Sequence, residues 1–181
     1  MIGDTANIAA RLEHAAEPGR SSSARRSICW REPALAIEHC NEAGSLASGV
    51  GLDEIRAFAD SCLAQVYLVA GRLHEVVEAG ERALANFETL GNLWWAGRTI
   101  AHLSPAAIAL GDWDASLKYC RRVVEYGTTL DDLRLKVVGL LRMGATYIQQ
   151  GDLERGLQCC DDALALWPAP YDAAVMKRIL G

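Results

Sequence analysis

The sequence predicts an all-α fold in which helix-turn-helix hairpins stack in tandem into a superhelical array. Glycines recur every 40 residues, at Gly71, Gly111 and Gly151, inside the similar strings VAGRLHEVV, ALGDWDASL and QQGDLERGL. Small and apolar residues follow each glycine at the spacing of one helix stripe. No window shows the clear alternation of apolar and polar residues that marks a half-buried strand.

The repeat register extends back to Arg31 in WREPALAI, which keeps the 40-residue spacing without a glycine. Three columns follow these four anchors. They hold Ile37, Val77, Leu117 and Leu157 at the sixth residue, Cys40, Gly80, Cys120 and Cys160 at the ninth, and Ala43, Ala83, Val123 and Ala163 at the twelfth. These offsets place the columns on one face of a helix with 3.6 residues per turn.

Each glycine is expected to end one helix and begin a turn, because glycine readily takes the left-handed conformation. The pattern predicts first helices over 53–70, 93–110 and 132–150, and second helices over about 73–87, 113–126 and 153–166. Asn92 and Asp131 are good N-cap residues. Pro168 is a stop signal, and Pro105 is expected to kink its helix or to shift the start of that helix.

The last unit has Gly144 and Tyr147 in its first helix, the Gly151-Asp152 turn, and then Gly156, Ala163 and Pro168. With this spacing the units over about 34–168 resemble the tetratricopeptide repeat, although they are 40 residues long and that repeat has about 34. The resemblance implies a binding groove lined by the first helix of each pair. Its groove positions fall on Phe58, Ser61, Gln65, Leu68, Arg98, Ala101, Ile108, Val138, Leu141 and Ile148.

These groove residues are largely apolar, and Arg98 is the one cation among them. The groove lacks the Lys and Asn rows with which members of the family clamp a terminal carboxylate. Two kinds of partner stay open: a hydrophobic segment of another protein, or domains of a parent protein that packs on this face.

The chain opens with MIGDTANIAARLEHAAEPG. Residues 2–19 resemble a late segment of bacterial class III adenylate and guanylate cyclases. The resemblance implies that Asn7 orients the ribose and that Arg11 stabilises charge on the phosphoryl group during cyclisation. Asn7 and Arg11, four residues apart, share one face of a helix. The alternative is an ordinary helix, capped by Asp4 or Thr5, in which Arg11 is solvated.

In the cyclase family, the aspartates that hold Mg or Mn lie upstream of this segment, and an apolar strand follows it. Here Gly19 is followed by RSSSARRS. We therefore expect residues 1–19 to be a cyclase remnant, which could arise from a decayed gene, a misassigned start or a joined fragment. We expect no cofactor in this chain and no catalysis by the chain alone.

Two functions remain open. One is a non-catalytic interaction or sensor module from a cyclic-nucleotide signalling protein. The other is part of a cyclase that donates Asn7 and Arg11 to a site completed by another chain. Residues 20–32 are expected to be a Ser/Arg-rich linker, with a basic nucleic-acid patch as the alternative. Residues 33–170 are expected to form the array, and 171–181 to begin a further repeat.

The composition narrows the partners and the location. A formal net charge of -5 gives no reason to expect nucleic acid or an anionic membrane as a partner. No apolar run is long enough to span a bilayer, and Asp4, Arg11 and Glu13 interrupt any secretory signal, so we expect the cytoplasm. The four histidines and six cysteines show no metal-site spacing, so we expect structural roles for them.

Overall fold

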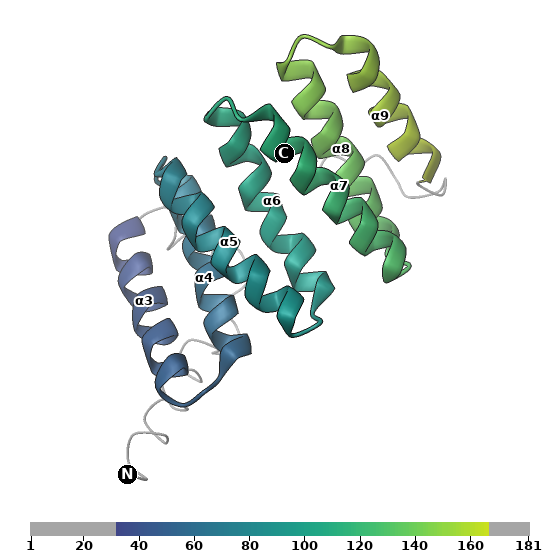
Figure 1. The fold of residues 1–181 in the computed structure, drawn as a ribbon. Helices are drawn as coiled ribbons and strands as arrows, with labels where there is room; N and C mark the ends of the chain where they lie inside the picture. The colour runs from purple at the N-terminus through teal and green to yellow at the C-terminus, as the bar shows by residue number, and fades with distance from the viewer. Residues whose placement is uncertain (1–31, 167–181) are drawn as a thin grey trace, which may run out of the picture.

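The computed structural model of the chain describes residues 32–166. Within this range the fold is all-α, as predicted, and successive helices lie side by side in chain order (Figure 1). The helices are α3 (Pro33–Gly49), α4 (Asp53–Val69), α5 (Leu73–Thr89), α6 (Leu93–Ala109), α7 (Trp113–Thr129), α8 (Leu133–Gln149) and α9 (Leu153–Leu166). The segments 1–19, 20–31 and 171–181, with Asn7, Arg11 and Pro168, lie outside the described residues.

One turn geometry joins all of these helices. Gly71 has a φ of 70°, its N–H donates to the carbonyl of Leu68, and the next N–H, of Arg72, donates to the carbonyl of Tyr67. This is the Schellman arrangement, in which a left-handed residue satisfies carbonyls at the end of the preceding helix. Gly51, Gly91, Gly111 and Gly151 take the same left-handed conformation. The turns between hairpins therefore match those inside them, and helix and turn together repeat every 20 residues.

The remaining turn corrects one prediction. Asp131 is not the N-cap of α8: it occupies the glycine position of the turn, with a φ of 50°. The cap is Asp132, whose Oδ1 accepts from the backbone N–H groups of Arg134 and Leu135. The other predicted cap is confirmed, since Asn92 accepts from the N–H of Trp95.

Asp131→Gly is expected to raise the free energy of unfolding by about 0.5–1 kcal/mol, because glycine takes a positive φ without the steric cost that a Cβ carries. Asp131 is exposed, and its carboxylate lies 3.8 Å from Lys136 Nζ, a surface ion pair of little value. Urea unfolding followed by circular dichroism measures the change. Gly91→Asp, the reverse change in an equivalent turn, is expected to lower stability, and equal stability of both variants with the parent would contradict this account.

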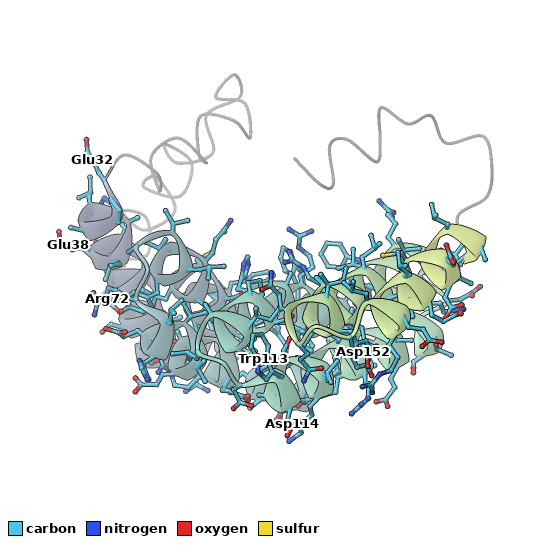
Figure 2. All side chains as sticks on the ribbon, turned by 90° about the horizontal axis from the view of Figure 1, so that it is seen from above. Glu32, Glu38, Arg72, Trp113, Asp114 and Asp152 are labelled. Carbon is cyan, nitrogen blue, oxygen red and sulfur yellow. The ribbon has the colours of Figure 1, made fainter. Side chains whose placement is uncertain are left out.

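The array is curved, and Figure 2 shows it as an arc with Asp114 of α7 on the outer rim. The contacts between helices agree with this shape. The backbone of α6 approaches those of both α4 and α8, whereas the odd-numbered helices that the structure describes meet one another only through long side chains. Helices that approach one another lie on the inside of a curve. The even-numbered helices therefore line the concave face, and the odd-numbered helices form the convex face.

Side-chain contacts between neighbouring hairpins follow one register. Ser61 bonds Thr99, Asn92 bonds Glu54, and two tyrosines of α7 bond glutamates of α5, each pair 38 residues apart. The offset is two residues short of the 40-residue repeat, so the α6–α7 hairpin is shifted slightly along the helix axis relative to the α4–α5 hairpin.

The largest core cluster extends from α4 to α8, and its aromatic residues gather where α4, α5 and α6 meet. Phe87 is fully buried, and its ring meets Phe58 edge-on at 5.2 Å between centroids. Trp95 stands edge-on to Phe58 at 4.4 Å. Helix α6 begins at Leu93 despite Pro105, so the predicted shift of its start does not occur.

Candidate functional site

The concave face takes its charge from α6 and α8. Neither helix contains an aspartate or a glutamate, although the whole chain is acidic. α6 buries Ala96, Ile100, Leu103 and Ala107, and the opposite stripe stays partly exposed, with Arg98 at its centre. None of the ion pairs between described residues includes Arg98 or Arg142. The part of the concave face formed by α6 and α8 is thus cationic, and Arg98 and Arg142 have no carboxylate partner among the described residues. The third concave helix, α4, differs, since it carries Asp53, Glu54 and Asp60.

Arg98 is held by two tryptophans. Its guanidinium carbon lies 5.2 Å from the centroid of Trp94 and 5.5 Å from that of Trp95, within the range of cation–π attraction. The two indoles stand perpendicular, with centroids 4.8 Å apart. Trp95 is half-buried and packs against the largest core cluster, whereas Trp94 is 39% exposed. Arg98 and Trp94 together offer a fixed cation beside an open aromatic surface.

The pKa of His102 reflects the positive charge on this face. Burial and, to a smaller extent, the positive charges of Arg98 and Arg142 together lower the pKa of its imidazole from 6.5 to about 4. Two arginines from different helices thus act on one site between α6 and α8. At neutral pH His102 is uncharged, and the cationic character of the face comes from the arginines.

The depressed pKa of His102 predicts a loss of stability in acid. Between pH 6.5 and about pH 4 the unfolded chain binds a proton at this residue and the folded chain does not. The free energy of unfolding should therefore fall as the pH drops through this window, by at most about 3 kcal/mol from His102. Urea titrations at pH 7.5 and 4.5 measure the loss. Carboxylates titrate there too, so the test is that His102→Gln loses clearly less stability than the parent.

The structure places the predicted groove residues in three environments. Gln65, Arg98 and Ile148 are exposed. Half-buried positions are held by Phe58, Leu68, Ala101, Ile108, Val138 and Leu141. Ser61 is buried and its hydroxyl lies 3.0 Å from that of Thr99, so it joins α4 to α6 and is not open to a ligand. Phe58 and Leu68 also pack into core clusters, which leaves the accessible face more polar than the sequence indicated.

A buried hydroxyl cluster holds α6, α7 and α8 together beneath this face. Ser116 lies 3.0 Å from the hydroxyl of Ser104 and 2.8 Å from that of Thr146, and Ser104 also meets the thiol of Cys120. All four side chains are fully buried. Sequence reasoning missed this cluster because its members lie 12 and 30 residues apart and share no repeat column. The cluster fixes the spacing of three helices that carry the concave surface.

On the convex face, by contrast, charged and polar side chains of α5 and α7 are paired with one another. Tyr126 donates to Glu88, which also pairs with Arg122, and Tyr119 donates to Glu81 at 2.5 Å. Burial and the hydrogen bond to Glu88 raise the pKa of Tyr126 to about 12, and burial likewise raises the pKa of Tyr119. These bonds bridge α5 and α7 across the outer surface.

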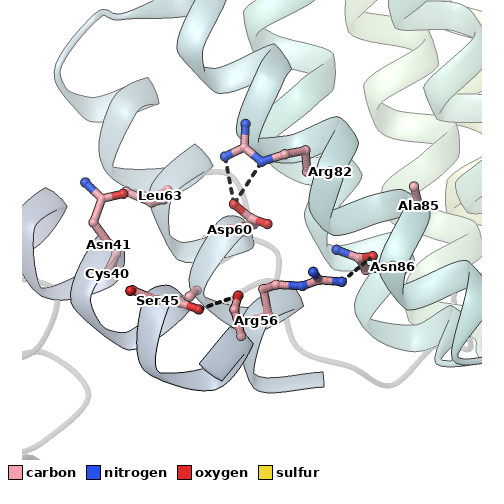
Figure 3. Close-up of a pocket in the computed structure, with 12 residues that line it drawn as sticks. Cys40, Asn41, Ser45, Arg56, Asp60, Leu63, Arg82, Ala85 and Asn86 are labelled. Atoms are coloured by element: carbon pink, nitrogen blue, oxygen red, sulfur yellow. Dashed lines mark hydrogen bonds and ion pairs between the residues drawn. The ribbon is translucent and has the colours of Figure 1, made fainter. Parts of the chain in front are cut away.

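A second concavity lies on the convex side, over α4 and between α3 and α5 (Figure 3). It is an open cleft of about 540 Å³. Two nitrogens of the Arg82 guanidinium, Nε and Nη2, donate to Asp60 Oδ1, at 3.2 and 2.7 Å. Arg56 Nη2 reaches Asn86 at 3.4 Å and Asp53 at 3.0 Å.

The cysteines differ from one another more than the sequence suggested. Cys120 and Cys159 are buried, as expected of structural thiols, and burial raises the pKa of each. Cys62 is exposed, and a hydrogen bond from Cys40 lowers its pKa to about 7. The thiolate is the nucleophile, so Cys62 is the reactive thiol of this group.

Alkylation by iodoacetamide is expected to modify Cys62 first, with a pH midpoint near 7, while Cys120 reacts only on unfolding. Peptide mass spectrometry over a pH series measures the rates. Cys40→Ala removes the donor and should move the midpoint toward the ordinary thiol value of 9.0. An unchanged midpoint in that variant would contradict the assigned cause.

No constellation for metal binding is present among residues 32–166: no three His, Cys, Asp or Glu side chains gather there. Over the same range, no helix is long and apolar enough to cross a membrane. The residues implied by the cyclase resemblance, Asn7 and Arg11, belong to the part of the chain outside this range.

No protein-family model matches the sequence, and no curated protein matches it. Among solved structures, the fold is similar to the crystal structure of BtubC (BKLC) from P. vanneervenii, with a TM-score of 0.65 and 18% sequence identity. The match covers 75% of this chain and 59% of that one, so this chain spans well under two thirds of the neighbour's length. At this identity the likeness shows the fold alone, a helical repeat array.

Proposed function

We propose that this chain is a non-catalytic protein-interaction module that holds an extended, acidic segment of a partner protein on its concave face. The single observation that carries the proposal is the charge of that face. Arg98 and Arg142 project from two helices without a carboxylate, and the described ion pairs leave both without an anionic partner. A partner that brings carboxylates supplies the missing counter-charge.

The resemblance to tetratricopeptide repeats supports the same role, since that family mostly binds proteins or peptides. Where the sequence analysis expected an apolar ligand, we propose an acidic one with one aromatic or apolar side chain. Trp94 offers a surface for that side chain, and Ile148 adds an exposed apolar contact on α8. Arg98 is fixed on its tryptophans before binding, which lowers the entropy lost when a ligand orders it.

A defined peptide tests the proposal. We would titrate an acetylated peptide of alternating Glu and Phe, and its Lys counterpart, into the full chain and follow tryptophan fluorescence. The acidic peptide should bind, the basic one should not, and added salt should weaken binding because exposed ion pairs are screened.

Arg98→Glu reverses one charge on the concave face and should weaken binding at least about tenfold, as expected for loss of a charge-assisted contact. Arg121→Glu is the matched control, because Arg121 is exposed on convex helix α7. Equal weakening by both variants would reduce the effect to net charge, and binding of both peptides alike would refute the proposed chemistry.

We further propose that the module serves a cytoplasmic signalling protein that makes cyclic nucleotides. Support comes from the resemblance of residues 2–19 to class III cyclases. The test is cyclic nucleotide production from ATP and from GTP with Mn²⁺, compared with an Asn7→Ala, Arg11→Ala variant. Turnover above that variant would instead favour a site completed between chains.

A further inference from the structure

The cleft on the convex face can be compared with the equivalent gap one repeat later, between α5 and α7, which side chains fill. Between α5 and α7 the gap holds the rings of Tyr119 and Tyr126, which reach across to Glu81 and Glu88. Both tyrosines are buried, at 6% and 9% exposure. The two phenol rings therefore fill the gap between α5 and α7.

Moving back by one 40-residue repeat shows why the cleft between α3 and α5 is open. The equivalents of Tyr119 and Tyr126 are Ala79 and Asn86, and those of Glu81 and Glu88 are Asn41 and Ser48. Asn86, Asn41 and Ser48 all line the cleft. The cleft therefore lies where the equivalents of the two tyrosine–glutamate pairs are missing, and this absence explains why the gap is open.

The same comparison explains the charge of the cleft. Its floor carries Arg56 and Asp60, where the next repeat has the buried apolar Ala96 and Ile100. Arg82 keeps the place of Arg122, but the glutamate that pairs with Arg122 has become Ser48. The cleft is thus lined by two guanidinium groups and one carboxylate, and Asp53, outside the lining, pairs with Arg56.

Donors remain available in this lining. Among residues 32–166, Arg82 bonds through Nε and Nη2, both directed at Asp60, and Arg56 bonds through Nη2. Each arginine therefore keeps Nη1 for another acceptor. Small side chains, Gly44, Ala59 and Ala85, leave room between these groups for a flat ligand.

We propose that this cleft binds a small aromatic carboxylic acid, whose ring takes the space that Tyr126 fills in the next repeat and whose carboxylate accepts from Arg56 and Arg82. The ring is inferred from the filled neighbour, and the acidic group from the two guanidinium groups in the lining. This site lies on the convex face and does not depend on the function proposed for the concave face.

Benzoate is the probe, and benzamide is its neutral match in shape. Titration of each into the isotopically labelled full chain, followed by ¹H–¹⁵N NMR, should shift the side-chain amides of Asn41 and Asn86 with benzoate. We expect a dissociation constant on the order of 1–10 mM, as befits so small a ligand, and clearly weaker binding of benzamide.

Two variants in the cleft and two controls on the concave face locate the site. Asn86→Tyr restores the ring of the next repeat and should abolish benzoate binding, while Gln65→Tyr adds the same ring on the concave face and should leave it intact. Arg82→Gln, at a mostly exposed side chain, should weaken binding about tenfold and serves if Asn86→Tyr loses its helical circular dichroism. Arg98→Glu should have no effect, which separates this site from the concave one.

The proposal is overturned if benzoate at about 50 mM shifts no cleft resonance, a concentration well above the expected constant. It is also overturned if benzamide binds as well as benzoate, or if Asn86→Tyr or Arg82→Gln binds benzoate like the parent.

Discussion

Phe87→Ala is expected to lower the free energy of unfolding by about 3–5 kcal/mol, the cost of a large cavity in a packed core. Phe87 is fully buried at the end of α5, with its ring edge-on to Phe58 and stacked at 6.4 Å on Trp95. These contacts join three consecutive helices. In an array whose helices contact only near neighbours, a loss at such a junction uncouples the units on its two sides.

Urea unfolding followed by circular dichroism measures this loss, and a broadened or two-step transition would report the uncoupling. Leu90→Ala is the matched control, because Leu90 follows the same helix and is 46% exposed. We expect it to cost less than about 1 kcal/mol. A similar loss for both variants would contradict the central place assigned to Phe87.

Gly127→Ala is the second large effect, with an expected loss of about 1–3 kcal/mol. A Cβ on Gly127 would lie 2.7 Å from the backbone nitrogen of Lys136 and 3.0 Å from the carbonyl oxygen of Asp132. Backbone cannot swing aside as a side chain can, so α7 and α8 would have to separate at the turn that joins them.

Gly49→Ala is the same chemical change at the end of α3, where an added Cβ meets nothing within 4 Å. It should leave stability unchanged or raise it by up to about 1 kcal/mol, because alanine favours the helix. Thermal unfolding of both variants tests the opposite signs, and a loss at Gly49 equal to that at Gly127 would show that close packing is not the cause.

Much of the fold could be predicted because its signals are local. Gly71, Gly111 and Gly151 mark turns by backbone conformation alone, and the helices between them begin within a residue of the predicted positions. Gly51 and Gly91 carry the same signal at half the spacing, so the 20-residue unit of helix and turn was also visible in the sequence. Asp131 misled the prediction because aspartate favours both caps and left-handed turns.

The candidate sites could be predicted less well, because they depend on which helices meet. Arg98 was identified from the groove positions, but the neighbouring Arg142 was not, and its role follows from the packing of α8 beside α6. The cleft at Asn86 was missed because it arises from a missing side chain: Asn86 stands where the next repeat has a tyrosine. Only alignment of the two hairpins in space shows what that position would have filled.

The alternation of helices between two faces limits how this array can change in length. Each unit of helix and turn is 20 residues, and the turns inside and between hairpins are alike. Loss or gain of one unit would keep every turn intact, yet it would move each later helix to the opposite face and carry the arginines of the concave side outward. Only the gain or loss of an even number of units keeps each later helix on its own face and preserves the binding surface. The turns themselves would allow any number, so the alternation of faces is what restricts the array to changes by whole hairpins.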